Sequence, residues 1–284
     1  MEALRLIQVS DIHLSRKRAY FQDNWEAFLE AVRAEPPRFV VVTGDLCVDG
    51  PGEPDDIAFA REQLDRLPVP WAAIPGNHDL GDRPPDAKLG QNITDALRER
   101  YLAHFGEDWW LREVGGWRLI GLDSQLFASG LAAEGEQARW LERTLAEGDG
   151  APVALFLHKP LWVHDPADAT LNSHDTDLPN RTWLLKLCLA HNVRFVGAGH
   201  VHRFWQFTHA GIEFLWCPAT AFRNSGKLKV QEERRILGYA ELHLADERVT
   251  SRVVIPSTFT QHDMSEAIRT LGSTAKLPPR PYSG

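Results

Sequence analysis

Five short polar segments, far apart in the chain, contain side chains that commonly bind metal ions. They are Ser10-Asp11-Ile12-His13, Gly44-Asp45, Gly76-Asn77-His78-Asp79, His158-Lys159-Pro160 and Gly199-His200-Val201-His202. Their ligating groups are carboxylates, imidazoles and one carboxamide, with no pair of thiolates. This set suits Mn, Fe or Zn, and also Co or Ni, better than calcium or a cysteine-built zinc site. The sequence therefore predicts a metalloenzyme.

The spacing within these segments favours a shared pocket. Residues two apart on an extended backbone lie on one face, so Asp11 and His13 can converge on a single site, as can His200 and His202. In the third segment, Gly76 allows a sharp turn that presents adjacent polar side chains from a loop.

Each polar segment follows an apolar run, which predicts a buried strand. The five runs cover residues 4–9, 39–42, 71–74, 153–157 and 194–196. Open α/β sheets bind ligands at the carboxyl ends of their strands. We therefore expect the polar segments to meet at one sheet edge.

Helical periodicity alternates with these strands. Apolar residues recur at three- and four-residue intervals over 23–34, 54–67, 92–105, 134–147 and 180–191. Alternating strands and helices predict a mostly parallel sheet. Short strands predicted after His202, at 203–208, 212–216, 239–244 and 249–255, would form a second, more antiparallel sheet.

The chain is long enough for one large domain of about 250 residues. We assign 1–256 to a catalytic domain and 257–284 to a C-terminal extension. The extension would contain a short helix over 263–271 and would pack on the domain or on a neighbouring subunit.

In their order, the five segments resemble the signature of the calcineurin-like metallophosphoesterases, and the resemblance spans about residues 4–220. Gly121-Leu122-Asp123-Ser124, Gly130-Leu131 and 137–142 make the chain most similar to the branch of class III cyclic-nucleotide phosphodiesterases and glycerophosphodiesterases. The resemblance implies an α/β fold, a four-layer αββα sandwich of two mixed β-sheets flanked by helices. Val48 stands where purple acid phosphatases carry a tyrosine ligand, which excludes that branch.

The same resemblance implies a centre with two divalent metal ions. The first ion would be bound by Asp11, His13 and His202, the second by Asn77, His158 and His200, and both by Asp45. A hydroxide that bridges the ions would attack phosphorus, because metal coordination can lower the pKa of water to roughly 7.

Two further residues receive catalytic roles from the resemblance. His78 would stabilise the transition state or protonate the leaving oxygen, which is worth about 10²- to 10⁴-fold in rate. Asp79 would hydrogen-bond the imidazole of His78 and fix its tautomer. The alternative for Asp79, a carboxylate that caps a turn or helix, stays open.

Basic side chains near the predicted site could hold a phosphate oxygen. Arg16, Lys17 and Arg18 follow the first segment and Arg203 follows the last. Arginine pairs with phosphate in a bidentate manner. For Arg16, Lys17 and Arg18, an exposed basic turn is an interpretation of equal weight to phosphate binding. For Lys159 we favour the exposed basic turn over phosphate binding.

Aromatic residues and loop histidines near the site have two interpretations each. Trp162, Phe204 and Trp205 could stack on a base, but packing is the better interpretation. The polar stretch 162–179 could form a lid or a specificity element. Within it, His164 and His174 are interpreted as solvated residues, with a substrate contact as the alternative.

Composition limits the partners and the location. A net charge of −8 argues against a general nucleic-acid binder, because long phosphate polymers are held by clustered Lys and Arg. The N-terminus lacks a signal-peptide pattern and no apolar run approaches membrane length, so we expect a cytoplasmic protein without a membrane partner. Cys47, Cys188 and Cys217 fit reduced thiols.

Together these features predict a dinuclear metal-dependent phosphoesterase. Its partner would be a small phosphodiester, such as a 3′,5′-cyclic nucleotide or a glycerophosphodiester. A phosphomonoesterase with the same metal core is the closest alternative, and a binding scaffold without catalysis is a more distant one. A homo-oligomer is compatible with the sequence.

Overall fold

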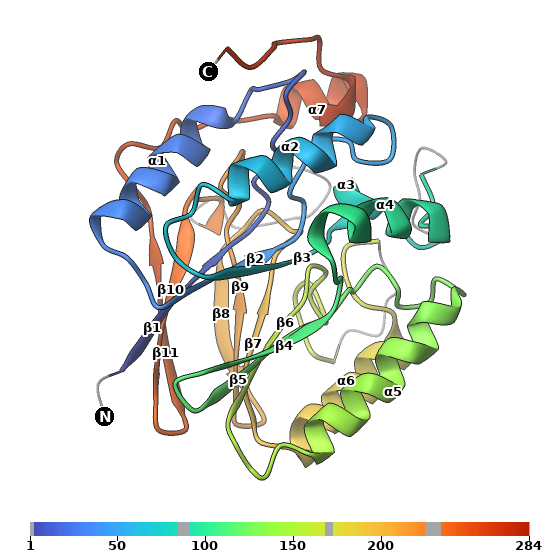
Figure 1. The fold of residues 1–284 in the computed structure, drawn as a ribbon, viewed down its shortest axis with the longest axis vertical. Coiled ribbons are helices and arrows are strands. Elements are labelled where there is room, and N and C mark those ends of the chain that lie inside the picture. The colour runs from blue at the N-terminus through green and yellow to red at the C-terminus, as the bar shows by residue number, and fades with distance from the viewer. Residues whose placement is uncertain (1–2, 85–90, 168–172, 225–233, 284) are drawn as a thin grey trace.

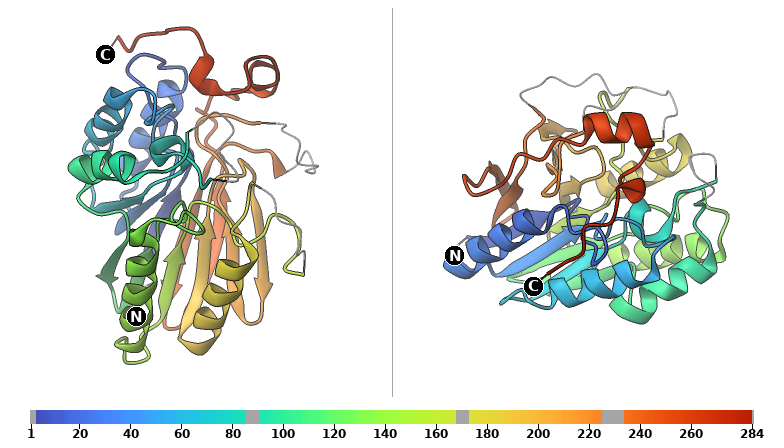
Figure 2. Two further views of the ribbon diagram at one scale, coloured as in Figure 1. Left: turned by 90° about the vertical axis from the view of Figure 1, so that its right-hand side faces the viewer. Right: turned by 90° about the horizontal axis from the view of Figure 1, so that it is seen from above.

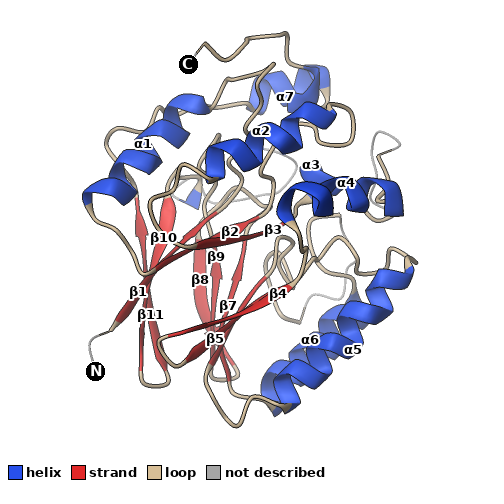
Figure 3. Cartoon of the chain, in the orientation of Figure 1, coloured by secondary structure: helices blue, strands red, loops and turns tan. Residues whose placement is uncertain are grey.

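The computed structural model describes residues 3–84, 91–167, 173–224 and 234–283. Two β-sheets pack face to face, and helices cover both outer faces (Figure 1). Coloured by secondary structure, the strands form the centre of the molecule and the helices its outside (Figure 3). The predicted αββα sandwich is confirmed.

The first sheet has five strands in the order β11-β10-β1-β2-β3. They are β1 (Leu4–Val9), β2 (Phe39–Thr43), β3 (Trp71–Ile74), β10 (Tyr239–Ala245) and β11 (Arg248–Val254). β1, β2 and β3 are parallel, whereas β10 pairs antiparallel with β1 and with β11. The helices on the side of this first sheet are α1 (Gln22–Ala34), α2 (Pro54–Leu64), the single turn α3 (Asn77–Leu80) and α4 (Asp95–Phe105).

The second sheet has six strands in the order β4-β5-β6-β7-β9-β8. They are β4 (Trp110–Val114), β5 (Trp117–Gly121), β6 (Val153–Phe156), β7 (Val193–Ala198), β8 (Trp205–His209) and β9 (Ile212–Trp216). Only the outer pairs β4–β5 and β8–β9 are antiparallel. Helices α5 (Ala132–Ala146) and α6 (Leu178–Ala190) cover this sheet.

The predicted division of strands between the sheets is wrong. We expected the five strands before the polar segments in one sheet and the strands after His202 in the other. Instead β8 and β9 extend the sheet of β6 and β7, while β10 and β11 extend the sheet of β1. Hydrophobic periodicity reports which faces of a strand are buried, but it does not report which distant strand is the neighbour. The polar segments consequently come from both sheets.

Alternate residues of each strand build separate cores. In β1, Leu6 packs between the sheets, whereas Ile7 packs toward the helices over the first sheet. In β6, Phe156 packs between the sheets and Leu155 packs toward α5 and α6. This is the two-residue period of a strand that is buried on both faces. Close packing on both sides fixes the strand ends that carry the polar segments.

The C-terminal extension lies across the end of the sandwich where the parallel strands terminate (Figure 2). It contains α7 (Ser265–Leu271), which ends at Gly272, and a short 3₁₀ helix, Thr274–Lys276. Gly272 has a φ of 85°, a conformation that suits a glycine at a helix C-terminus. No helix among the described residues has the length and apolar character needed to cross a bilayer.

Candidate metal centre

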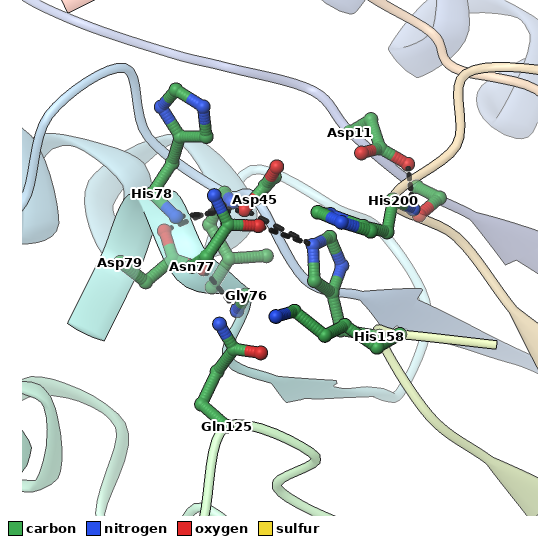
Figure 4. Close-up of polar contacts among 12 residues, drawn as sticks. Asp11, Asp45, Gly76, Asn77, His78, Asp79, Gln125, His158 and His200 are labelled. Carbon is green, nitrogen blue, oxygen red and sulfur yellow. Dashed lines mark hydrogen bonds and ion pairs between the residues drawn. The ribbon is translucent and has the colours of Figure 1, made fainter. Parts of the chain in front are cut away.

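The carboxyl ends of five strands from both sheets deliver the predicted ligands to one place, and Figure 4 shows five of these residues, Asp11, Asp45, Asn77, His158 and His200. The first sheet supplies Asp11 and His13 after β1, Asp45 after β2 and Asn77 after β3, and the second supplies His158 after β6 and His200 and His202 after β7. The seven residues predicted as ligands are therefore brought together, although they come from two sheets rather than from one.

The backbone is strained at most of these positions. Five of the seven residues have a positive φ, namely Asp11 (53°), His13 (42°), Asp45 (51°), His200 (68°) and His202 (49°). A left-handed conformation costs a non-glycine residue about 1–2 kcal/mol, and it persists only where the surroundings enforce it. β1, β2 and β7 thus end in sharp bends that turn the next side chains toward a common point.

Glycines allow the bends to approach one another closely. A Cβ atom added to Gly76 would lie 2.3 Å from Oδ1 of Asp45. Gly44 has a φ of 82°, and a Cβ there would lie 2.4 Å from Nδ1 of His158. Any side chain at either position would displace a ligand.

One group of ligand atoms forms around His13 and His202. Their Nε2 atoms are 3.3 Å apart, and Nε2 of His202 lies 3.3 Å from Oδ1 of Asp11. Oδ2 of Asp45 lies 3.7 Å from Nε2 of His13. Ligand atoms from these four residues all lie within 4.8 Å of one another, so one cation can contact them together.

A second group lies on the other side of Asp45. Nε2 of His158 is 3.2 Å from Oδ1 of Asp45 and 3.3 Å from Oδ1 of Asn77. Ligand atoms of Asp45, His158 and His200 again lie within 4.8 Å of one another. Asp45 is the residue common to both groups, and it presents a different carboxylate oxygen to each.

Hydrogen bonds orient the imidazoles toward the centre. Nδ1 of His158 lies 2.8 Å from the Thr43 carbonyl oxygen, and Nδ1 of His202 lies 2.8 Å from that of Phe222. Each Nδ1 therefore donates, which leaves Nε2 as the metal-binding atom. Neither ring nitrogen of His200 has a hydrogen-bond partner among the described residues, although both are buried. A metal ion would satisfy such a nitrogen.

The electrostatics of the site also fit a cation. Burial would raise the pKa of Asp45, but the neighbouring imidazoles, His158 foremost, hold it well below its usual range. Burial would lower the pKa of His158, but Asp45 outweighs it and raises this pKa to about 9. Burial lowers the pKa of both His13 and His200, so these two rings stay neutral as metal binding requires.

His78 lies beside the centre, but its predicted contact with Asp79 is wrong. Nδ1 of His78 lies 2.7 Å from the Val48 carbonyl oxygen. The Asp79 carboxylate instead accepts from the backbone N–H groups of Leu46, Cys47 and Gly76. Burial and the Asp45 charge raise the pKa of Asp79 to about 6. The alternative interpretation of Asp79, a carboxylate that caps the turn, is the one that the structure supports.

A cavity of about 200 Å³ opens above the ligands. Asp45, Asn77 and His78 line its floor. Its outer part includes side chains that the sequence did not single out, namely Asp82, Gln91, Asn224, Ile268, Ser273 and Thr274. None belongs to a recognisable motif, and the only signal for the last three was a C-terminal segment expected to pack on the domain.

The four basic residues predicted to bind substrate are placed elsewhere. Arg16 pairs with Glu62 at 2.5 Å, and Lys17 and Arg18 pair with Glu53 at 2.6 and 3.5 Å. Arg203 is buried, donates to the Val163 carbonyl oxygen and lies over the ring of Trp205. The cavity lining contains none of the four. We therefore leave them out of the proposed site.

Of the other side chains discussed near the site, some are buried or lie outside the cavity lining and one lines the cavity. Trp162 is buried among Phe207, Phe214 and Trp216, and Lys159 is buried in an ion pair with Asp82. His164 lies near Arg203, outside the cavity lining, whereas His174 lines the cavity and its ring centroid is 5.6 Å from that of His200. Part of the predicted lid, 168–172, lies outside the described residues.

The residues after β5 that suggested the narrower branch have a structural role. Gln137 on α5 accepts from the backbone N–H of Asp123 at 2.8 Å and donates to its carbonyl oxygen at 3.0 Å. Ser124 Oγ accepts from the backbone N–H of Lys159 at 2.9 Å. The first two bonds fix the loop after β5, and the third ties this loop to the segment that carries the predicted ligand His158.

Known proteins share this combination of fold and residues. The family model for calcineurin-like phosphoesterases matches residues 4–204. Over 228 residues, 76% of each protein, the chain is 28% identical to the 3′,5′-cyclic adenosine monophosphate phosphodiesterase CpdA of Escherichia coli. Over 194 residues, 63% of this chain and 58% of the relative, it is 30% identical to the serine/threonine-protein phosphatase CPPED1 of Danio rerio. A dimetal phosphatase from Danio rerio has the same fold, with a TM-score of 0.60, 16% identity and coverage of 89% of this chain and 96% of the other.

Proposed function

The chain belongs to the calcineurin-like phosphoesterase family and is a metal-dependent phosphoric ester hydrolase, and we propose that its substrates are small phosphodiesters. Cyclic 3′,5′-nucleotides and glycerophosphodiesters are the two candidate groups. The observation that carries the proposal is the position of Asp45, which belongs to two ligand groups on the floor of a small cavity.

We propose that these groups hold two divalent ions. Asp11, His13 and His202 would hold one, Asn77, His158 and His200 the other, and Asp45 both. A carboxylate between two cations offsets their mutual repulsion. When bound, the ions would activate a water molecule near neutral pH and neutralise charge on the phosphoryl group. Imidazole and carboxylate ligands suit Mn, Fe or Zn, and also Co or Ni.

The cavity favours a small substrate with a single negative charge. Its volume of about 200 Å³ lies below the ~300–1,000 Å³ typical of ligand pockets, so it suits a small ester better than a polymer. No Lys or Arg is present among the described lining residues, so the ions alone would have to neutralise the second charge of a monoester. The likeness to the bacterial cyclic-nucleotide phosphodiesterase agrees with this preference.

His78 is the proposed proton donor to the leaving oxygen. Its Nδ1 lies 2.7 Å from the Val48 carbonyl oxygen, so Nδ1 keeps its proton and Nε2 is the atom that can donate. In its protonated form the ring would give the Nε2 proton to the departing alkoxide and become neutral, while the bond from Nδ1 to Val48 is preserved. That carbonyl does the orienting that we had assigned to Asp79.

A substrate panel with metal-reconstituted enzyme tests the proposal. We expect higher kcat/KM for bis-p-nitrophenyl phosphate than for p-nitrophenyl phosphate, with further activity on either cyclic AMP or glycerophosphodiesters. The phosphatase named among the relatives makes monoesterase activity the specific alternative. A monoesterase rate well above the diesterase rate would replace the diester proposal by that alternative.

A further inference from the structure

The C-terminal extension forms part of the cavity wall. Ile268 on α7 and Ser273 and Thr274 after it line the same cavity as Asp45 and His78. The extension crosses the end of the sandwich at which both sheets present their ligands (Figure 2). Its position therefore affects whatever occupies the space above the metal centre.

The extension is held in place by backbone bonds to the loop after β1. Arg280 N donates to the carbonyl of Lys17 and Ala19 N donates to that of Arg280, both at 2.8 Å, and Tyr282 N donates to Arg16 at 2.8 Å. Arg18 Nε donates to the carbonyl of Leu277 at 3.0 Å. The basic residues of this loop thus help to anchor the C-terminal wall.

A hydrophobic cluster connects this wall to the metal ligands. Phe222 packs with Leu277 and Ile268, and its ring centroid lies 4.4 Å from that of His202 and 4.8 Å from that of His13. One aromatic ring consequently contacts both the ligands and the extension. The wall has a defined position relative to the ions that the site would hold.

Thr274 is the exceptional residue of this wall. It is only 2% exposed, and its Oγ1 has no hydrogen-bond partner among the described residues. A buried hydroxyl without a partner is destabilising. Because Thr274 lines the cavity, rotation to another staggered rotamer can bring the hydroxyl to a bound ligand.

Asp82 supplies a second polar group to the cavity. Its carboxylate lies 2.5 Å from Nζ of Lys159, which is itself buried. The pair offsets much of the carboxylate charge, while the oxygens can still accept a hydrogen bond. A hydroxyl group is a suitable donor to a carboxylate and a suitable partner for threonine.

We infer that Thr274, together with Asp82, binds hydroxyl groups on the organic arm of the substrate. The preferred substrates would then be diesters with a sugar or polyol arm rather than a plain alkyl arm. This inference rests on the proposed function, since it specifies the arm of the same phosphoester. Thr274 is a specificity-determining residue in this scheme, and the metal ligands act on the phosphoryl group alone.

The test compares two substrates that differ only in hydroxyl groups. They are p-nitrophenyl 2,3-dihydroxypropyl phosphate and p-nitrophenyl propyl phosphate, which share a leaving group. We expect the metal-loaded wild-type enzyme to prefer the dihydroxypropyl ester in kcat/KM by at least about 3-fold, the effect of one hydrogen bond. A ratio near unity in the wild-type enzyme would overturn the inference without any variant.

Variants then assign the preference to Thr274. We expect Thr274→Val to reduce the ratio by about 3- to 10-fold, whereas Thr274→Ser should retain the preference. Thr270→Val is the matched control, because Thr270 is an exposed threonine of the same extension outside the cavity lining. An unchanged ratio in Thr274→Val contradicts the inference.

Two further measurements distinguish a failure of the inference about Thr274 from a failure of the proposed function. Thr274→Val replaces an unpartnered hydroxyl by a methyl group, so its unfolding temperature should be equal to or above that of wild type; a loss of folding would show an internal partner and refute the premise. Glycerol phosphate and propyl phosphate form the corresponding monoester pair. A monoesterase that still prefers the glycerol arm would refute the diester proposal and leave the inference about Thr274 standing.

Discussion

The floor and the outer wall of the cavity reach their positions in different ways. On the floor, Asp45 and His200 adopt a positive φ although neither is a glycine, and three other ligands do the same. In the wall, the positive φ falls on Gly272, where it costs no strain. The floor therefore accepts backbone strain in order to aim the predicted ligands, whereas packing and backbone hydrogen bonds position the wall without such strain.

The largest expected effect comes from comparing a carboxylate on the cavity floor, Asp45, with one in the outer part of the cavity, Asp82. Asp45→Ala should lose both ions and reduce turnover by more than about 10³-fold, because in the proposed mechanism the ions would supply the nucleophile and most of the charge stabilisation. Asp82→Ala should keep its ions, since Asp82 lies outside both ligand groups. Elemental analysis measures the metal content of the two variants, and steady-state kinetics measures their turnover. An Asp45→Ala protein that retains two ions would rule out the bridging role.

A smaller effect is expected at His78, which lies on the floor but outside the ligand groups. His78→Ala should retain both ions and lose roughly 10²-fold in turnover on substrates with alkoxide leaving groups. The loss should be smaller with p-nitrophenyl esters, because p-nitrophenolate departs without a proton. Equal losses on both substrate types would contradict the proton-donor role, and loss of the ions would make His78 a ligand.

The same contrast explains what the sequence could predict. Asp11 and His13 lie two residues apart at the end of an apolar run, so their spacing and strand environment are both local features. Thr274 reaches the cavity only because the extension packs on Phe222 and pairs with the loop after β1. Such contacts depend on the complete fold, and a threonine has no distinctive chemistry that would indicate them.

Two incorrect predictions have different physical causes. The division of strands between sheets depends on long-range pairing, which periodicity does not encode. The assignment of Asp79 as the partner of His78 used their adjacency in sequence, but adjacent residues at the start of a helical turn point in different directions. Asp79 instead accepts from Gly76 and from the loop after β2, which stabilises the turn.

The strain on the floor can be measured in metal-free protein, and it gives the smallest effect. At His200, where φ is 68°, glycine avoids about 1–2 kcal/mol of backbone strain but costs about 0.5–1 kcal/mol in unfolded-state entropy. His200→Gly should therefore be more stable than His200→Ala by about 0.5–1 kcal/mol. Both variants lack the imidazole, so their difference isolates the backbone.

His158 provides the control, because it is a predicted ligand of the same centre without a positive φ. There only the entropy term acts, so His158→Ala should be more stable than His158→Gly by about 0.5–1 kcal/mol. Urea unfolding of the four variants with a chelator present measures both differences. If the Gly variant is the more stable one at His200 and the Ala variant is the more stable one at His158, the strain lies at the bent strand ends. The same sign at both would mean that the positive φ at His200 carries no strain, and the contrast between floor and wall would then be one of chemistry alone.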